Sequence, residues 1–254
     1  MHTKKALVNE LQALGISPGD KLLVHSSYKA VGQFEGGPVG LVQALMSYFN
    51  EGLLILPTHT WGKINQENPL FDPATEPACV GILPNIFMAQ AGVLRSLHPT
   101  HSVAAFGAGA ESFVAGEELI DTPCGRQGCW GKLLDMEAKI LFLGATLKSN
   151  TFIHGVEEWN DIPKRLTDER ELLQIKLPTG IIQSPQHRHI GDVSQHYDKL
   201  YEPFIAHQLI RQGSIGKASS SVIEAKPVYE LVSALLRREP DLFTDDQAIP
   251  VSWY

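Results

Sequence analysis

Three apolar stretches, each opened by a turn and closed by polar residues, constrain the fold of this chain more than any other feature. They lie in SPGDKLLVHSS (17–27), EGLLILPTHT (51–60) and MEAKILFLGATLKSNTFIHGVEE (136–158), and helical patterns follow the first and the third. Continuous apolar strands that alternate with helices predict a sheet covered by helices on both faces. We therefore expect a three-layer α/β/α fold with a central mixed, largely parallel sheet.

Helical spacing of apolar residues recurs near both ends of the chain. Residues 3–15 show it before Gly15, and residues 226–243 show it as far as Pro240. Glycine and proline at these places are typical helix stops. We expect a helix at each end.

The pattern of apolar and polar residues changes after Leu166. The stretch ELLQIKLPTGIIQSPQHRHIG predicts antiparallel strands about a Pro-Thr-Gly turn. We expect one domain, residues 1–254, with a small β-containing insertion at roughly 166–197. The polar segment 61–77 is long for a loop in a compact domain, and long ordered loops are usually functional.

Charge and cysteine content exclude several classes of protein. The 254 residues carry a net charge of −7 and lack a long Lys/Arg cluster, which argues against a nucleic-acid binder. No apolar run follows the N-terminus, so we expect no membrane partner and a cytoplasmic location. The three cysteines include no CxxC pair, which disfavours a disulfide framework or a cysteine zinc site. We interpret Cys124 and Cys129 as structural.

Polar residues follow each of the three apolar strands. They are His25-Ser26-Ser27, Thr58-His59-Thr60 and the loop that leads to Asn150, Thr151 and His154. Ligands of open α/β sheets collect in the crevice at the strand ends. The sequence therefore predicts a site here, with hydroxyls and amides that suit a phosphate or an oxyanion.

His154 is the main candidate for a chemical role. It lies near the start of a predicted helix that Asn150 or Thr151 would cap, and Glu157 and Glu158 follow at helical spacing. A carboxylate bonded to one ring nitrogen makes the other a better base. The spacing fits a general base and a surface histidine on a capped helix equally well.

Two histidine-rich stretches invite a metal interpretation. RSLHPTHSVAAFG contains the pair His98 and His101, and QHRHIGDVSQHYD (186–198) contains further histidines. An HxxH pair supplies two ligands, whereas a zinc site needs a third and a supporting shell. There is no HExxH, so we assign no metal. We interpret the first stretch as a polar loop or a cleft wall, and the histidines of the second stretch as surface histidines near a loop.

Eight motifs follow one another along roughly residues 4–240. They are GDKLLVHSSYKAVG, GGPVGLVQAL, EGLLILPTHT, PLFDPATEPACVGILPNIF, GVLRSLHPTHSVAAFG, TPCGRQGCWGKLL, ILFLGATLKSNTFIHGVEE and RQGSIGKASSSVIEAKPVYELV. With this ordered set the chain resembles the aminoglycoside 3-N-acetyltransferase family, the YokD-like acyl-CoA-dependent N-acyltransferases that are unrelated to GNAT acetyltransferases. The ordered pair RSLHPTHS and NTFIHGVEE is the most specific part of the resemblance.

The resemblance implies transfer of an acetyl group from acetyl-CoA to an amine of an aminoglycoside or related amino sugar. The transfer would occur in a ternary complex, without a covalent acyl-enzyme and without a metal. His154 would be the base, Glu157 would orient it, and Asn150 would complete the catalytic set. The residues expected to bind acetyl-CoA are His25, Ser26, Ser27, Ser96, His101, Ser102 and Gly125, and those expected to bind the acceptor are Asp72, Glu158 and Asp192.

Other interpretations stay open. One is an N-acyltransferase for a non-antibiotic amine in sugar or secondary-metabolite biosynthesis. A second is a non-catalytic CoA-binding relative, and a third is a metal-dependent hydrolase that uses His98, His101 and the later histidines. A homodimer is one possible assembly.

Overall fold

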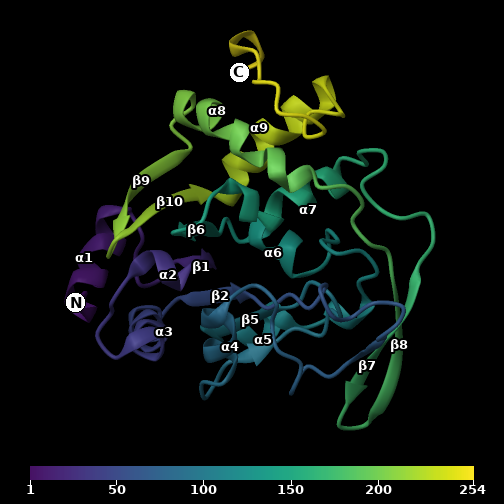
Figure 1. The fold of residues 1–254 in the computed structure, drawn as a ribbon, viewed down its shortest axis with the longest axis horizontal. Coiled ribbons are helices and arrows are strands. Elements are labelled where there is room, and N and C mark those ends of the chain that lie inside the picture. Colours follow the sequence, from purple (N-terminus) through teal and green to yellow (C-terminus); the bar gives the residue numbers. More distant parts are fainter.

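A seven-stranded sheet forms the centre of the computed structural model, which describes all residues from 1 to 254 (Figure 1). Its strand order is β4-β5-β2-β1-β6-β10-β9. The strands are β1 (Lys21–Ser26), β2 (Leu53–Pro57), β4 (Leu94–Arg95), β5 (Val103–Gly107), β6 (Lys139–Leu143), β9 (Ile210–Ile215) and β10 (Ala218–Glu224).

Parallel pairing is confined to the centre of this sheet. Strand β1 pairs parallel with both β2 and β6, and these are the three apolar stretches recognised in the sequence. The four outer pairings are antiparallel. The sheet is mixed as expected, but it is largely parallel only at its core, because β9–β10 and β4–β5 are hairpin-type additions at the two edges.

Helices cover both faces of the sheet, which confirms the three-layer α/β arrangement (Figure 1). Leu22 and Val24 of β1 face a core of 24 buried residues, and Leu23 between them faces a core of 33. This alternation is the two-residue period of a strand buried on both faces. The first core takes in α1 (Lys4–Ala13), α3 (Gly37–Tyr48) and α4 (Ile82–Met88), and the second takes in α5 (Ala110–Val114), α6 (Cys129–Asp135), α7 (Thr151–Trp159) and α9 (Ala225–Arg238).

Both terminal helices occur where the sequence predicts them. Helix α1 begins after Thr3, whose hydroxyl accepts a hydrogen bond from the Ala6 amide, and it ends just before Gly15. Helix α9 ends at Arg238, two residues before Pro240.

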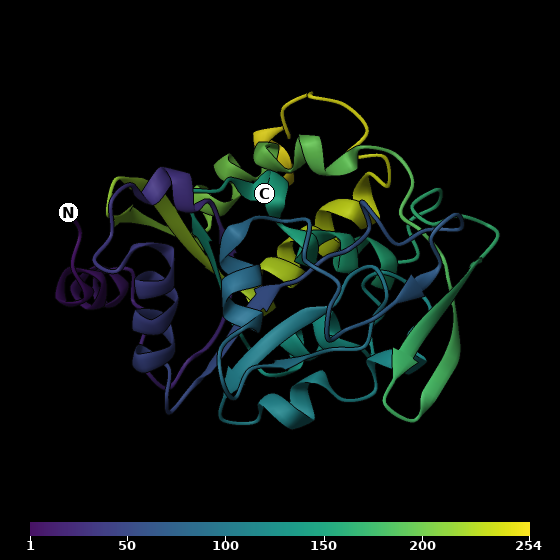
Figure 2. The ribbon, with the colours of Figure 1, turned by 60° about the horizontal axis from the view of Figure 1, so that its bottom comes forward.

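The predicted insertion forms a second, three-stranded sheet. Strands β7 (Glu171–Leu177) and β8 (Gly180–Gln186) pair antiparallel about the Pro-Thr-Gly turn, as expected. Strand β3 (Leu70–Phe71), from the long polar loop, pairs parallel with β7. This small sheet lies at the end of the molecule opposite the N-terminal helix (Figure 2).

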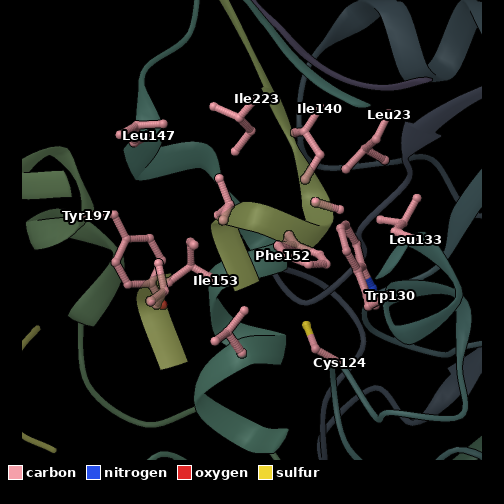
Figure 3. Close-up of a cluster of buried hydrophobic side chains, with 14 of the residues drawn as sticks. Leu23, Cys124, Trp130, Leu133, Ile140, Leu147, Phe152, Ile153, Tyr197 and Ile223 are labelled. Atoms are coloured by element: carbon pink, nitrogen blue, oxygen red, sulfur yellow. The ribbon is translucent and has the colours of Figure 1, made fainter. Parts of the chain in front are cut away.

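No helix of the chain is long and apolar enough to cross a membrane. In the second core, Phe152 and Ile153 of α7 pack between Trp130 and Tyr197, which fixes the helix that carries His154 (Figure 3). The remaining elements are α2 (Tyr28–Val31), α8 (Tyr201–Ala206) and the 3-10 helices Glu117–Leu119, Leu147–Ser149, Val193–Leu200 and Val251–Trp253.

Candidate active site

A cavity of about 480 Å³ opens where β1 and β2 end and α7 begins. The strand ends supply His25, Ser26 and His59, and α7 supplies Thr151 and His154. Residues 188–195, in the last part of the insertion, close the other side. Further residues on the wall are Val24, Pro57, Trp61, Val80, Pro84, Thr100, His101, Pro123, Lys148, Ser149, Arg188, His189, Gly191, Asp192, Ser194 and Gln195.

The His154 ring is held from behind by a tyrosine. The Tyr197 hydroxyl lies 2.9 Å from His154 Nδ1 and donates to Glu157 Oε2 at 2.5 Å. Glu157 Oε2 itself is 3.7 Å from Nδ1, which is too far for a hydrogen bond. Glu157 is therefore hydrogen-bonded to the imidazole through Tyr197, and the direct hydrogen bond expected from the i, i+3 spacing is not made.

This chain of contacts selects one tautomer of His154. A phenol has one proton, and the pKa of Tyr197 is raised well above its usual range by burial and by Glu157, so the hydroxyl stays protonated. Because that proton goes to Glu157, the tyrosine oxygen accepts a hydrogen bond from Nδ1–H. Nε2 of His154 then carries the lone pair, and it has no hydrogen bond within the protein.

Burial keeps this imidazole uncharged at neutral pH. The pKa of His154 is lowered well below 6.5, mainly by burial and then by His189 and Arg165. Arg165 Nε also bonds Glu157 Oε1 at 2.5 Å, so the buried carboxylate has a buried cation beside it. Burial raises the pKa of Glu157, and the hydrogen bonds from Tyr197 and Arg165 oppose that change.

Glu158 belongs to a different pair. Its Oε1 lies 2.7 Å from His189 Nε2 and accepts a hydrogen bond from the Cys124 amide at 2.9 Å. The His189 ring stacks on the His154 ring, with centroids 4.3 Å apart and planes 22° from parallel. Burial raises the pKa of Glu158 to about 7 and lowers that of His189 to about 3.

Asn150 occupies the N-cap position of α7, but its side chain makes no capping hydrogen bond. The expectation of a side-chain cap from Asn150 is therefore wrong. The nearby Thr151 hydroxyl bonds His59 Nε2 at 3.1 Å instead of capping the helix. Both polar atoms of the Asn150 side chain are buried without a partner, and the residue lies between two cavity residues, Ser149 and Thr151.

Three of the residues expected to bind acetyl-CoA line the cavity. They are His25, Ser26 and His101. His25 stacks on Phe142, and burial lowers its pKa to about 3. His101 Nδ1 is 2.9 Å from the Thr100 hydroxyl.

The structure places four others away from the cavity wall. The buried Ser96 hydroxyl accepts from the Val103 amide at 3.0 Å, and the buried Ser102 hydroxyl bonds the Thr58 carbonyl oxygen at 2.9 Å. Ser27 starts the short helix α2, and Gly125 lines a separate cavity of about 380 Å³. The Ser96 and Ser102 hydroxyls serve the fold, and none of the four residues lines the main cavity, so we do not carry them into the proposed site.

Of the expected acceptor carboxylates, only Asp192 lines the main cavity. Asp72 pairs with Lys176 at 2.8 Å across the small sheet. Glu158 lines the separate cavity and reaches the main one only through His189.

The potential metal ligands are engaged with the protein. His98 Nδ1 accepts from the amides of Thr100 and His101, and its Nε2 lies 3.0 Å from the Thr122 carbonyl oxygen. Ligand atoms of Cys124, Glu158 and His189 lie within 4.8 Å of one another. However, Glu158 and His189 bond each other, and burial raises the Cys124 thiol pKa well above 9, which disfavours the thiolate that binds metals. The interpretation of Cys124 as structural agrees with its place in the second core (Figure 3).

Sequence reasoning missed four residues of the site. His189 and Tyr197 both lie in QHRHIGDVSQHYD, which was interpreted as a surface stretch. Arg165 just precedes the insertion, and Lys148 comes two residues before Asn150. The one available signal was the density of histidines in 187–196, which indicated a site but neither its partner nor its chemistry.

Comparison with known proteins identifies the family to which this chain is similar. A family model described as aminoglycoside 3-N-acetyltransferase matches residues 23–237. Aminoglycoside N(3)-acetyltransferase III of Acinetobacter baumannii is 35% identical over 182 residues, which cover 65% of this chain and 63% of that relative. Aminoglycoside N(3)-acetyltransferase IV of Salmonella sp. is 27% identical over 94% of this chain and 89% of the relative. The chain thus spans less than two thirds of the first relative and most of the second.

Solved structures agree over nearly the whole chain. The acetyltransferase AAC-IIIb, bound to CoASH, superposes with a TM-score of 0.82 at 28% identity and covers 93% of this chain and 96% of its own. A mutant of AAC(3)-IVa in complex with a gentamicin gives a TM-score of 0.84 at 25% identity and covers 95% of this chain and 91% of its own.

Proposed function

The chain belongs to the aminoglycoside 3-N-acetyltransferase family, and on that premise we propose that it transfers the acetyl group of acetyl-CoA to an amine of an aminoglycoside or related amino sugar. The observation that carries the proposal is the free Nε2 of His154 in the main cavity, with Tyr197 and Glu157 behind the ring. Relatives of similar fold hold the two expected kinds of reactant, CoASH in one case and a gentamicin in another.

His154 acts as the general base in this proposal. The acceptor nitrogen attacks the thioester carbonyl carbon, a C–N bond forms, and the carbonyl electron pair moves to oxygen. His154 Nε2 takes a proton from the nitrogen, the C–S bond breaks, and the thiolate of CoA receives that proton. A positioned base contributes about 10² to 10⁴ in rate. Glu157, through Tyr197, stabilises the imidazolium that forms transiently.

The beginning of α7 supplies charge stabilisation for the oxyanion. The first amides of a helix have no intrahelical partner and carry partial positive charge. In α7 no side chain caps them, and Thr151 lies on the cavity wall. An unpartnered Asn150 amide next to them offers one more N–H donor. Preorganised donors of this kind lower the barrier by about 3 to 4 kcal/mol each.

Acetyl-CoA binds along the strand ends in this proposal. His25, Ser26 and His101 line that part of the wall, and Lys148 is its one lysine. The Lys148 ammonium is exposed and takes part in no ion pair. A free cation at the mouth of the cavity suits the phosphates of CoA.

The acceptor part of the cavity favours a second candidate, an acyltransferase for an amine with few charges. Asp192 is the single acidic residue on the wall, whereas Lys148 and Arg188 are basic. A drug with several ammonium groups gains most from several carboxylates. Amino sugars with one or two amines therefore fit this wall as well as an antibiotic does.

Release of free thiol from acetyl-CoA by the purified protein tests the proposal. The acceptor panel contains gentamicin, kanamycin, 2-deoxystreptamine and glucosamine. Turnover with the drugs supports an antibiotic acetyltransferase, and turnover with the small amines alone supports the second candidate. No turnover with any of them contradicts both. Intersecting initial-velocity lines and the absence of an acetylated protein by mass spectrometry are expected for a ternary complex.

A further inference from the structure

We propose that His189 is a second residue that binds the acceptor nitrogen. Nδ1 of His189 accepts a hydrogen bond from one N–H of a primary amine, while Nε2 of His154 takes the proton of the second N–H. This inference rests on the proposed function. It assigns a role to the hydrogen-bonded pair of His189 and Glu158, which the mechanism above does not use.

The tautomer of His189 follows from its partner. Glu158 Oε1 already accepts a hydrogen bond from the Cys124 amide at 2.9 Å, so this oxygen is an acceptor. Above the Glu158 pKa of about 7 the carboxylate can only accept, so His189 Nε2, 2.7 Å from the same oxygen, carries a proton and donates it. In a neutral imidazole the remaining nitrogen, Nδ1, then carries the lone pair.

That lone pair is available to a ligand. Nδ1 of His189 has no hydrogen bond within the protein, and it is not among the buried polar atoms that lack a partner. His189 lines the same cavity as His154, and the two rings lie nearly parallel at 4.3 Å. Two stacked imidazoles thus each bring one unbonded nitrogen to one cavity.

Two lone pairs match the needs of a neutral primary amine. When its own lone pair points at the thioester carbon, two N–H groups remain. One proton leaves to His154, and the other stays on nitrogen and becomes the N–H of the product amide. His189 holds the proton that stays, so it positions the amine without gaining a proton. Burial lowers the pKa of His189 to about 3, which keeps it uncharged at neutral pH.

A secondary amine breaks this match. Its neutral form has a single N–H, so an N-methyl group would lie against Nδ1 of His189 and leave that nitrogen unpaired. The pair therefore selects primary over N-methylated amines. Loss of one such hydrogen bond corresponds to a change of roughly tenfold in kcat/KM.

The experiment compares glucosamine with its N-methyl derivative, and 2-deoxystreptamine with the derivative that carries one methyl group on each of its two amines. The wild-type protein, His189→Phe and His189→Asn are assayed for thiol release. Phenylalanine keeps a flat ring against His154 but lacks a nitrogen, and the asparagine oxygen takes roughly the place of Nδ1. Thermal melting shows whether each variant is folded.

We expect His189→Phe to lose about tenfold in kcat/KM with the primary amines and little with the N-methyl derivatives, so that the preference disappears. The KM for acetyl-CoA should not change, and His189→Asn should regain part of the preference. Equal losses with both kinds of amine, or none with the primary amines, would overturn the inference and leave the proposed function standing. No thiol release by the wild type with any probe would contradict the proposed function itself.

Discussion

Removal of the Tyr197 hydroxyl should slow the reaction strongly while the fold survives. In Tyr197→Phe, His154 Nδ1 and Glu157 Oε2 remain 3.7 Å apart, beyond hydrogen-bond distance, so neither gains the other as a partner. The His154 ring is then free to place its proton on Nε2, which makes it useless as a base. A hydrogen bond to a charged group contributes about 1.5 to 3 kcal/mol. If that energy serves the transition state, kcat falls by roughly ten- to a hundredfold.

The same change also leaves Glu157 Oε2 buried with one donor fewer. We expect unfolding in urea to need about 1 to 3 kcal/mol less free energy. Tyr254→Phe is the matched control, because its hydroxyl has no hydrogen bond within the protein. Steady-state thiol release and urea unfolding are measured on the same samples. Full kcat in Tyr197→Phe would refute the idea that Tyr197 sets the tautomer of His154.

Three further predictions concern charge. The pKa values of His25, His98 and His189 are lowered to between about 3 and 4, so the unfolded chain binds protons that the folded chain does not. The free energy of unfolding should therefore fall as pH drops below about 6.5, by up to about 1.4 kcal/mol per pH unit for each histidine. Glu158, whose pKa is raised to about 7, opposes the effect of one histidine down to about pH 4.5. Thermal melts from pH 8 to 5 that show no decline in melting temperature would contradict this. Glu117→Ala removes the buried carboxylate that accepts a hydrogen bond from the Cys129 amide at the start of α6. The free energy of unfolding in urea should fall by about 1 to 3 kcal/mol, and an unchanged urea midpoint would contradict this prediction. Lys148→Ala should raise the KM for acetyl-CoA about three- to tenfold and leave the acceptor KM unchanged, so an effect on the acceptor alone would remove Lys148 from the CoA site.

Local sequence patterns predicted much of the fold. The three apolar stretches predicted the parallel centre of the sheet, and the Pro-Thr-Gly turn predicted the β7–β8 hairpin. The hairpin at the far edge, β9–β10, was not predicted, because no two-residue period of buried and exposed positions marks its strands, and its residues appeared only within a family motif.

The sequence predicted only the part of the site that lies on a single helix. His154, Glu157 and Glu158 share α7, so their spacing placed them together, but it could not show that the two carboxylates turn to different partners. Tyr197 and His189 come to the site from more than 30 residues further along the chain, by way of the insertion. Asn150 has the residue type and position of a helix cap, yet tertiary burial leaves its side chain without the expected bond.

The central claim is that His154 takes the acceptor proton, and a single-turnover experiment with His154→Ala tests it most directly. The variant is mixed with acetyl-CoA and the best acceptor of the panel, and acetyl-CoA binding is measured by calorimetry on the same preparation. His207→Ala, which changes an exposed histidine away from the cavity, is the control. We predict that acetyl-CoA binds to His154→Ala as tightly as to the wild type while transfer slows by at least about a hundredfold. Transfer at the wild-type rate would contradict the account.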